Sequence, residues 1–207
     1  VISPDDAFQK AIAQAAELVA DKLERIVTFG IRPTYPAESF GYIERGAPLI
    51  AGAKASAASA YHVKQFREKP KAEVAREYVE EGTFLWNSGI FVWSAATILQ
   101  ALEERQPEMV ARLRTIAAAV GTPQYAEVLE REFTAIRGVS IDYAVMEHAR
   151  DVVVIEAPFR WDDVGSWQAI ARLRGTDDQG NTILAQHVGL NTSGTIVRGP
   201  DGHLIVT

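Results

Sequence analysis

The residues from Tyr61 to Phe91 read YHVKQFREKPKAEVAREYVEEGTFLWNSGIF and contain a strand–helix–strand pattern. Residues 61–66 are rich in aromatic and β-branched side chains, which is typical of a β-strand. After the tetrapeptide REKP, apolar residues recur at helical spacing until Gly82, which predicts a helix that ends there. Residues 85–93 form a second apolar run, interrupted by the polar tripeptide NSG, and predict a second strand. The stretch therefore predicts an α/β fold.

Polar residues accompany both predicted strands, and open α/β sheets bind ligands at the carboxyl ends of their strands. Lys69 is a compact cation that suits contact with a phosphate group, and Glu68 suits hydrogen bonds from ligand hydroxyl groups. A solvated lysine and a surface acid at a helix start explain the same two residues. Asn87 lies inside an apolar run and needs hydrogen-bond partners, which a ligand hydroxyl or a neighbouring backbone would supply. Gly41 is interpreted equally well as a close approach of backbone to a ligand or as an ordinary bend.

The composition is that of a globular protein large enough for one α/β domain, or for most of one with an appendage. The chain has 207 residues, of which 47% are hydrophobic and 23% charged. Its net charge of −6 gives no overall attraction to phosphate backbones, so we expect no nucleic-acid polymer as a partner. No apolar run approaches the ~18 residues of a membrane span and no signal peptide is visible, so we expect no membrane partner. The chain has no cysteine, which excludes disulfides and cysteine nucleophiles and favours a cytoplasmic location.

The rest of the chain predicts further strands and helices around this unit. Ser3 is expected to cap a helix whose first position is Pro4. The small residues at 51–60 predict a mobile hairpin tip. Other strands are predicted at 1–2, 26–30, 41–46 and 151–155, and other helices at 95–104, after Pro107, after Pro123 and at 166–173.

A change of composition at Gly175 predicts a second domain. Residues 176–181 have the chemistry of a turn, and short β runs follow at 182–184, 195–198 and 203–206. We therefore expect one domain at 1–175 and the start of a β-rich carboxy-terminal domain at 181–207.

Five stretches resemble, in the same order, motifs of the sugar-phosphate nucleotidyltransferases. They are TFGIRPT at 28–34, FREKP at 66–70, WNSGIF at 86–91, SIDYAVME at 140–147 and WDDVGSW at 161–167. The resemblance implies a three-layer α/β nucleotidyltransferase fold, glycosyltransferase-A-like, with a mixed sheet and the start of a carboxy-terminal β-helix-like appendage. That family also has a Gly-rich phosphate loop near its amino terminus, which this sequence lacks. We therefore interpret the chain as the part that follows the nucleotide-binding segment, with the first strands missing.

The activity implied by this resemblance is transfer of a guanylyl group from GTP to mannose 1-phosphate, which gives GDP-mannose and diphosphate. Lys69 and Asp163 would be catalytic, with Asp163 as the ligand of a Mg²⁺ cofactor and Asp162 as a variable neighbour. Glu68, Lys69, Asn87 and Gly41 would bind the substrate. A helix cap is the alternative explanation of the two aspartates.

The sequence is also compatible with three other functions. The first is a sibling transferase with another sugar or base, and the second is a non-catalytic sugar-phosphate-binding subunit. The third is a structural fragment whose β appendage mediates oligomerisation, and a homodimer is also open. Asp142 and Tyr143 receive no distinct role, because a short helix capped by Ser140 explains them as well.

Overall fold

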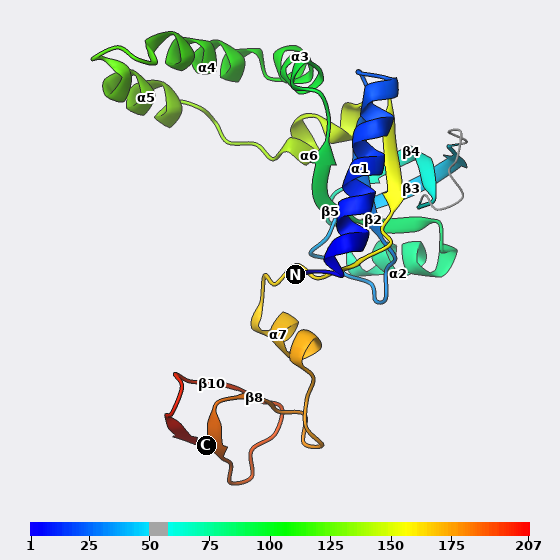
Figure 1. The fold of residues 1–207 in the computed structure, drawn as a ribbon, viewed down its shortest axis with the longest axis vertical. Coiled ribbons are helices and arrows are strands. Elements are labelled where there is room, and N and C mark those ends of the chain that lie inside the picture. The colour runs from blue at the N-terminus through cyan, green and yellow to red at the C-terminus, as the bar shows by residue number, and fades with distance from the viewer. Residues whose placement is uncertain (50–57) are drawn as a thin grey trace. The chain divides into compact units, whose positions relative to one another are not determined.

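A computed structural model describes residues 1–49 and 58–207, and the chain forms two compact units. One unit is Pro4–Phe159, and the other combines Val1–Ser3 with Arg160–Thr207. The hairpin tip predicted at 51–60 falls largely on residues 50–57, outside the described residues (Figure 1).

The Pro4–Phe159 unit is built on five strands that close into a barrel in the order β2-β5-β3-β4-β6. Strands β2 and β6 are parallel and every other pair is antiparallel, so the sheet is mixed as predicted. Their β-branched and aromatic residues suit a buried pleated surface. The bounds are β2 Ile26–Ile31, β3 Tyr42–Pro48, β4 Ala60–Arg67, β5 Phe84–Val92 and β6 Val152–Glu156.

Gly30 allows the closest packing in this barrel. It pairs with Asn87 across the β2–β5 ladder. A Cβ at position 30 would lie 2.5 Å from Cδ1 of Leu85 and 2.8 Å from Cγ2 of Val154. Only a glycine fits between these two core side chains, which explains why the TFG motif contains one.

The helices of this unit follow the predicted periodicity, with one error at the first helix start. They are α1 Asp5–Asp21, α2 Ala72–Glu81, α3 Ala95–Arg105, α4 Pro107–Ala119, α5 Tyr125–Thr134, α6 Ile141–Ala144 and the 3₁₀ helix η1 Met146–His148 (Figure 1). Gly82 ends α2 with a left-handed φ of 68°, and Ser140 Oγ accepts a hydrogen bond from the N–H of Tyr143, so both predictions are confirmed. The prediction for Ser3 and Pro4 was wrong. Pro4, with an extended ψ of 157°, is itself the N-cap residue and precedes α1, while Ser3 belongs to a strand.

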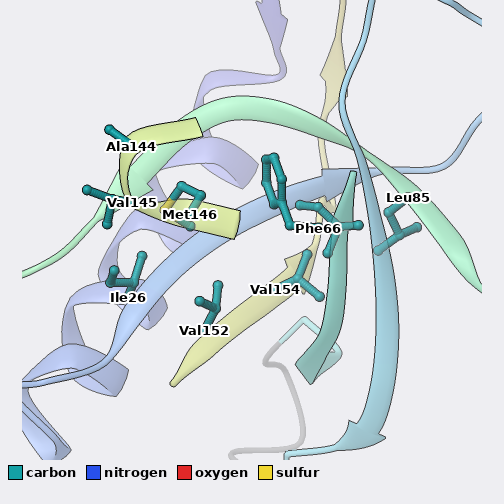
Figure 2. Close-up of a cluster of buried hydrophobic side chains, with 9 residues drawn as sticks. Ile26, Phe66, Leu85, Ala144, Val145, Met146, Val152 and Val154 are labelled. Atoms are coloured by element: carbon teal, nitrogen blue, oxygen red, sulfur yellow. The ribbon is translucent and has the colours of Figure 1, made fainter. Parts of the chain in front are cut away.

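One hydrophobic core, called the main core below because it carries the site, joins the barrel to the α6–η1 segment. Figure 2 shows Ala144, Val145 and Met146 packed over strand residues of β2, β4, β5 and β6. The three residues are almost fully buried. Burying side chains of this size contributes on the order of 1–3 kcal/mol each, so the short α6 helix is firmly anchored despite its four residues.

The second unit consists of short strands and one helix. Strand β1 (Ile2–Ser3) pairs antiparallel with β7 (Arg160–Trp161), and helix α7 spans Trp167–Arg174. Strand β8 (Thr182–Leu184) pairs in parallel with β10 (Ile196–Arg198), and β9 (Gln186–Val188) does so with β11 (Leu204–Val206). The runs predicted for β8, β10 and β11 are confirmed, whereas β9 was missed because Gln186 and His187 give it little apolar or β-branched character. Among the described residues, no helix combines the length and apolarity that a membrane span requires.

Candidate functional site

The turn after β4 separates a buried carboxylate from an exposed ammonium group. The Glu68 side chain is 9% exposed and that of Lys69 is 59% exposed, with Lys69 Nζ 3.4 Å from Glu68 Oε1. Lys69 has a φ of 44°, a left-handed conformation that costs a non-glycine residue on the order of 1 kcal/mol. This turn therefore keeps a negative group inside the unit while a cation next to it stays available to an anionic ligand.

Gly41 brings the backbone before β3 against both Glu68 and Asn87. Its carbonyl oxygen accepts a hydrogen bond of 2.8 Å from the backbone N–H of Asn87. A Cβ at position 41 would lie 2.6 Å from Glu68 Oε2 and 3.4 Å from Cβ of Asn87. Glycine is therefore required for the buried position of the Glu68 carboxylate, beyond any requirement for a bend.

The Asn87 amide has hydrogen-bond partners on both its ends. Its Oδ1 accepts from Thr28 Oγ1 at 3.3 Å and from the backbone N–H of Gly89 at 3.2 Å. Its Nδ2 donates to Asp142 Oδ1 at 3.2 Å. Gly89 has a left-handed φ of 71°, which favours glycine, and the register of the β2–β5 pairing shifts at Asn-Ser-Gly, so the motif forms an irregularity of the β-bulge kind within strand β5.

Burial perturbs the two carboxylates of this cluster in the same direction. The pKa of Glu68 is raised, first by loss of solvation and then by the negative charge of Asp142, while Lys69 opposes the shift. The pKa of Asp142 is also raised by loss of solvation, against hydrogen bonds from its own backbone and from Asn87 and against the charge of Lys69. Two poorly solvated acceptors beside an accessible cation suit a ligand that carries both hydroxyl groups and a negative charge.

The aspartates of the second unit have different surroundings. Both oxygens of Asp162 accept from Arg172, from Nε and from Nη2, at 3.2 Å each. Asp163 is exposed, and no described residue forms a hydrogen bond or ion pair with its carboxylate. Neither aspartate caps α7, whose N-cap residue is Ser166 without a side-chain bond.

A Mg²⁺ ion suits the donor set that Asp163 offers. Magnesium is commonly held by one or two carboxylates together with substrate phosphates and water. The part of the chain that the structure describes has no group of three or more His, Cys, Asp and Glu side chains placed for a metal. A single exposed carboxylate without a competing cation fits the first arrangement and not an all-protein metal cage.

The structure thus brings together four of the five predicted site residues. Gly41, Glu68, Lys69 and Asn87 lie around one cluster in the Pro4–Phe159 unit, whereas Asp163 belongs to the other unit.

Sequence reasoning missed a fifth member of the cluster, Asp142, although it had singled out the SIDY segment. It also missed Thr28, the first residue of the TFGIRPT stretch, whose hydroxyl group is fully buried beside Asn87.

Comparison with known proteins shows to which family this chain belongs. Residues 1–179 match the family model described as Nucleotidyl transferase. The chain belongs to the nucleotidyl transferase family. It is 32% identical over 206 residues to a mannose-1-phosphate guanylyltransferase of Sinorhizobium fredii, an alignment that covers 99% of this chain and 38% of that protein. The chain spans about two fifths of the length of the curated relatives it matches.

Two solved structures share the fold of this nucleotidyl transferase chain. One, from Thermus thermophilus, is named mannose-1-phosphate geranyltransferase and is 32% identical with a TM-score of 0.79, covering 100% of this chain and 57% of that one. The other, a mannose-6-phosphate isomerase from Helicobacter pylori, is 27% identical with a TM-score of 0.63, covering 79% of this chain and 60% of that one. The α/β nucleotidyltransferase fold with a mixed sheet is therefore shown.

Proposed function

We propose that this protein transfers a guanylyl group from GTP to mannose 1-phosphate, giving GDP-mannose and diphosphate. The observation that carries the proposal is the cluster of Gly41, Glu68 and Asn87 beside the exposed ammonium group of Lys69. Curated relatives at 32–34% identity bear the name mannose-1-phosphate guanylyltransferase, which supports the choice of both substrates. The proposal includes a cytoplasmic location, which the lack of cysteine supports.

The reaction needs positioning and charge neutralisation more than covalent catalysis. A phosphate oxygen of the sugar phosphate attacks the α-phosphorus of GTP, and diphosphate leaves on the opposite side. Two anions must approach each other, so a cation beside the attacking phosphate stabilises the transition state. We assign that cation to Lys69, whose ammonium group is more than half exposed. Glu68 and Asn87 would hold the hydroxyl groups of the sugar, so that its phosphate points at the nucleotide.

Magnesium is the cofactor that this proposal includes. When bound, Mg²⁺ would supply positive charge that offsets the negative charge of the substrate phosphates. Asp163 is the residue of this chain that would ligate it, because its carboxylate is exposed and unengaged among the described residues. Asp162 is bound by Arg172 and is the poorer candidate.

The experiment that tests the proposal is diphosphate release from GTP, Mg²⁺ and mannose 1-phosphate. Glucose 1-phosphate and the other nucleoside triphosphates are run alongside, to detect a sibling transferase with another sugar or base. We expect release to require GTP and mannose 1-phosphate together. Equal release with another pair would reassign the substrates. Binding of mannose 1-phosphate without release from any pair would leave two alternatives, a sugar-phosphate-binding subunit or an enzyme whose nucleotide-binding segment is not in the tested chain.

A further inference from the structure

The hydrogen-bond capacity of Asn87 is largely used within the protein. The backbone N–H of Gly89 can only donate, and an ionised Asp142 can only accept. These two neighbours therefore fix the amide with its oxygen toward Gly89 and its nitrogen toward Asp142. Thr28 Oγ1 lies 3.3 Å from the same oxygen, but its single hydrogen is shared with the carbonyl oxygen of Ile90 at 3.0 Å. Asp142 takes one of the two N–H groups of Asn87, and no described residue takes the other, so this residue offers a ligand a donor.

The Asp142 carboxylate has unused hydrogen-bond acceptor sites. An ionised carboxylate has about four acceptor sites. In the structure Asp142 accepts from Asn87 Nδ2 and from its own backbone, which leaves about two sites for a ligand. Its position is rigid, because Ser140 caps α6 and the residues that follow are buried in the main core (Figure 2). Loss of solvation raises the pKa of Asp142, so its ionised form is poorly satisfied inside the protein.

The Glu68 carboxylate, in the same cluster, is also poorly solvated in its ionised form. It is 9% exposed, and Lys69 is its partner at 3.4 Å. Gly41 packs against both Glu68 and Asn87, and Asn87 donates to Asp142, so the two carboxylates belong to one cluster. In agreement with this, the negative charge of Asp142 contributes to raising the pKa of Glu68. Holding two such groups together is unfavourable for folding, and a ligand that donates hydrogen bonds to both would relieve the cost.

We propose that Asp142 is a specificity-determining residue that binds a hydroxyl group of the sugar, alongside Glu68 and Asn87. The three side chains form a set of two acceptors and one donor, which fits a polyol with at least two hydroxyl groups directed at the carboxylates. This inference rests on the proposed function and deepens it. It assigns a role to a residue of the SIDYAVME stretch, which a capped helix alone explained before.

The test is equilibrium binding of mannose 1-phosphate and its monodeoxy analogues to the chain and to the variant Asp142→Asn. The variant keeps the shape and an oxygen that accepts from Asn87 Nδ2, so the fold and the amide orientation are retained. We expect it to bind mannose 1-phosphate roughly 10-fold more weakly, the loss of about 1.4 kcal/mol in a hydrogen bond to a charged group. Tyr143→Phe, next along the chain and half-exposed, is the matched control and should bind normally.

The deoxy analogues separate direct binding from a structural role. If Asp142 contacts one hydroxyl group, the analogue that lacks this group binds the unmodified chain weakly, and Asp142→Asn weakens it no further. For each analogue, the loss of affinity relative to mannose 1-phosphate is compared between the unmodified chain and Asp142→Asn. If this loss is the same on both proteins for every analogue, Asp142 binds no hydroxyl group and the inference is overturned. Asp142→Ala provides a second variant with the same expected pattern, and circular dichroism verifies that both variants are folded.

Dependence on pH gives a second readout. The titratable groups that act on Glu68 and Asp142 are these two carboxylates themselves, Lys69 and Glu147. Binding of mannose 1-phosphate should weaken as the pH falls through the raised pKa of Asp142, and this part of the profile should disappear in Asp142→Asn. An unchanged profile would contradict the inference. No binding by the unmodified chain at any pH would overturn the proposed function and, with it, this assignment.

Discussion

The two acidic regions of this chain differ in what surrounds their carboxylates. Glu68 and Asp142 lie beside the barrel, poorly solvated, with raised pKa values and neighbouring hydrogen-bond donors that hold them in place. Asp162 and Asp163 lie in the other unit, where one is paired with Arg172 and the other is exposed to solvent. Carboxylates of the same chemistry are therefore suited to different tasks, because the degree of solvation sets how stable the ionised form of each one is.

This difference separates selection of the sugar from neutralisation of the phosphates. A buried acceptor discriminates between ligands, since a missing hydroxyl group leaves it without a partner. An exposed carboxylate discriminates poorly but is accessible to a hydrated cation. Substitutions in the exposed region should therefore affect turnover and its Mg²⁺ dependence, whereas substitutions in the buried cluster should affect sugar affinity.

The largest effect is expected from Asp163→Asn. If Asp163 ligates Mg²⁺, this variant should lower Mg²⁺-dependent diphosphate release by roughly 100-fold, the range seen when one stabilising group is removed from a transition state. The measurement is the initial rate as a function of Mg²⁺ concentration. Asp162→Asn is the matched control, with nearly normal turnover and at most about 1 kcal/mol less stability from the lost pair with Arg172. The reverse order of effects would move the metal site to Asp162.

Lys69→Ala should have the next largest effect, on the affinity for mannose 1-phosphate. Removing a charged hydrogen-bond donor costs about 2 kcal/mol, which is roughly 30-fold in affinity. Isothermal titration calorimetry measures it directly. Lys71→Ala removes an exposed lysine two residues away and should bind normally. Equal losses in both variants would mean that Lys69 acts only through the general charge of this surface.

Gly41→Ala tests whether the close approach at this position serves the ligand or the fold. The new methyl group would displace the Glu68 carboxylate, so we expect roughly 10-fold weaker sugar-phosphate binding and less than about 1 kcal/mol change in the free energy of unfolding. Gly30→Ala is the contrasting variant. Its methyl group would meet core side chains of Leu85 and Val154, so we expect about 1–3 kcal/mol of destabilisation in urea denaturation. Normal affinity in Gly41→Ala would remove Glu68 from the site.

The smallest expected effect is a pH-dependent gain of stability in Glu68→Gln. Because the folded state raises the pKa of Glu68, the native protein holds this proton more tightly than the unfolded chain does, and stability falls as the pH rises through the window above the ordinary glutamate value. Replacing the carboxylate removes this penalty. We expect a higher Tm than that of the unmodified protein at about pH 7, with the difference vanishing near about pH 4, the ordinary range of a glutamate. A lower Tm at neutral pH would show that the pair with Lys69 outweighs the burial of Glu68.

Several local features could be predicted because short-range physics fixes them. Gly82 ends α2 since a left-handed residue favours glycine, and Ser140 caps α6 since its hydroxyl group reaches a backbone N–H three residues on. The start of α1 was predicted wrongly, because a proline suits both the residue before a helix and its first turn. Strand β9 was missed although strands of the same length were predicted, because two of its three residues, Gln186 and His187, are polar and not β-branched.

The sequence by itself located the residues to which the proposed chemistry is assigned: Glu68 and Lys69 after one strand, Asn87 inside another, and Asp163 near a helix. Their positions relative to strands and helices are encoded locally, so a pattern predicts them, whereas their proposed roles rest on the resemblance to the nucleotidyltransferase motifs. Only the tertiary structure decided that Asp142 contributes an acceptor oxygen to the same cluster, that Asn87 keeps a single free donor, and that Gly41 is required by the Glu68 carboxylate. These facts depend on burial and on contacts between residues far apart in the chain, such as Asn87 and Asp142 at a separation of 55 positions, which no local pattern contains.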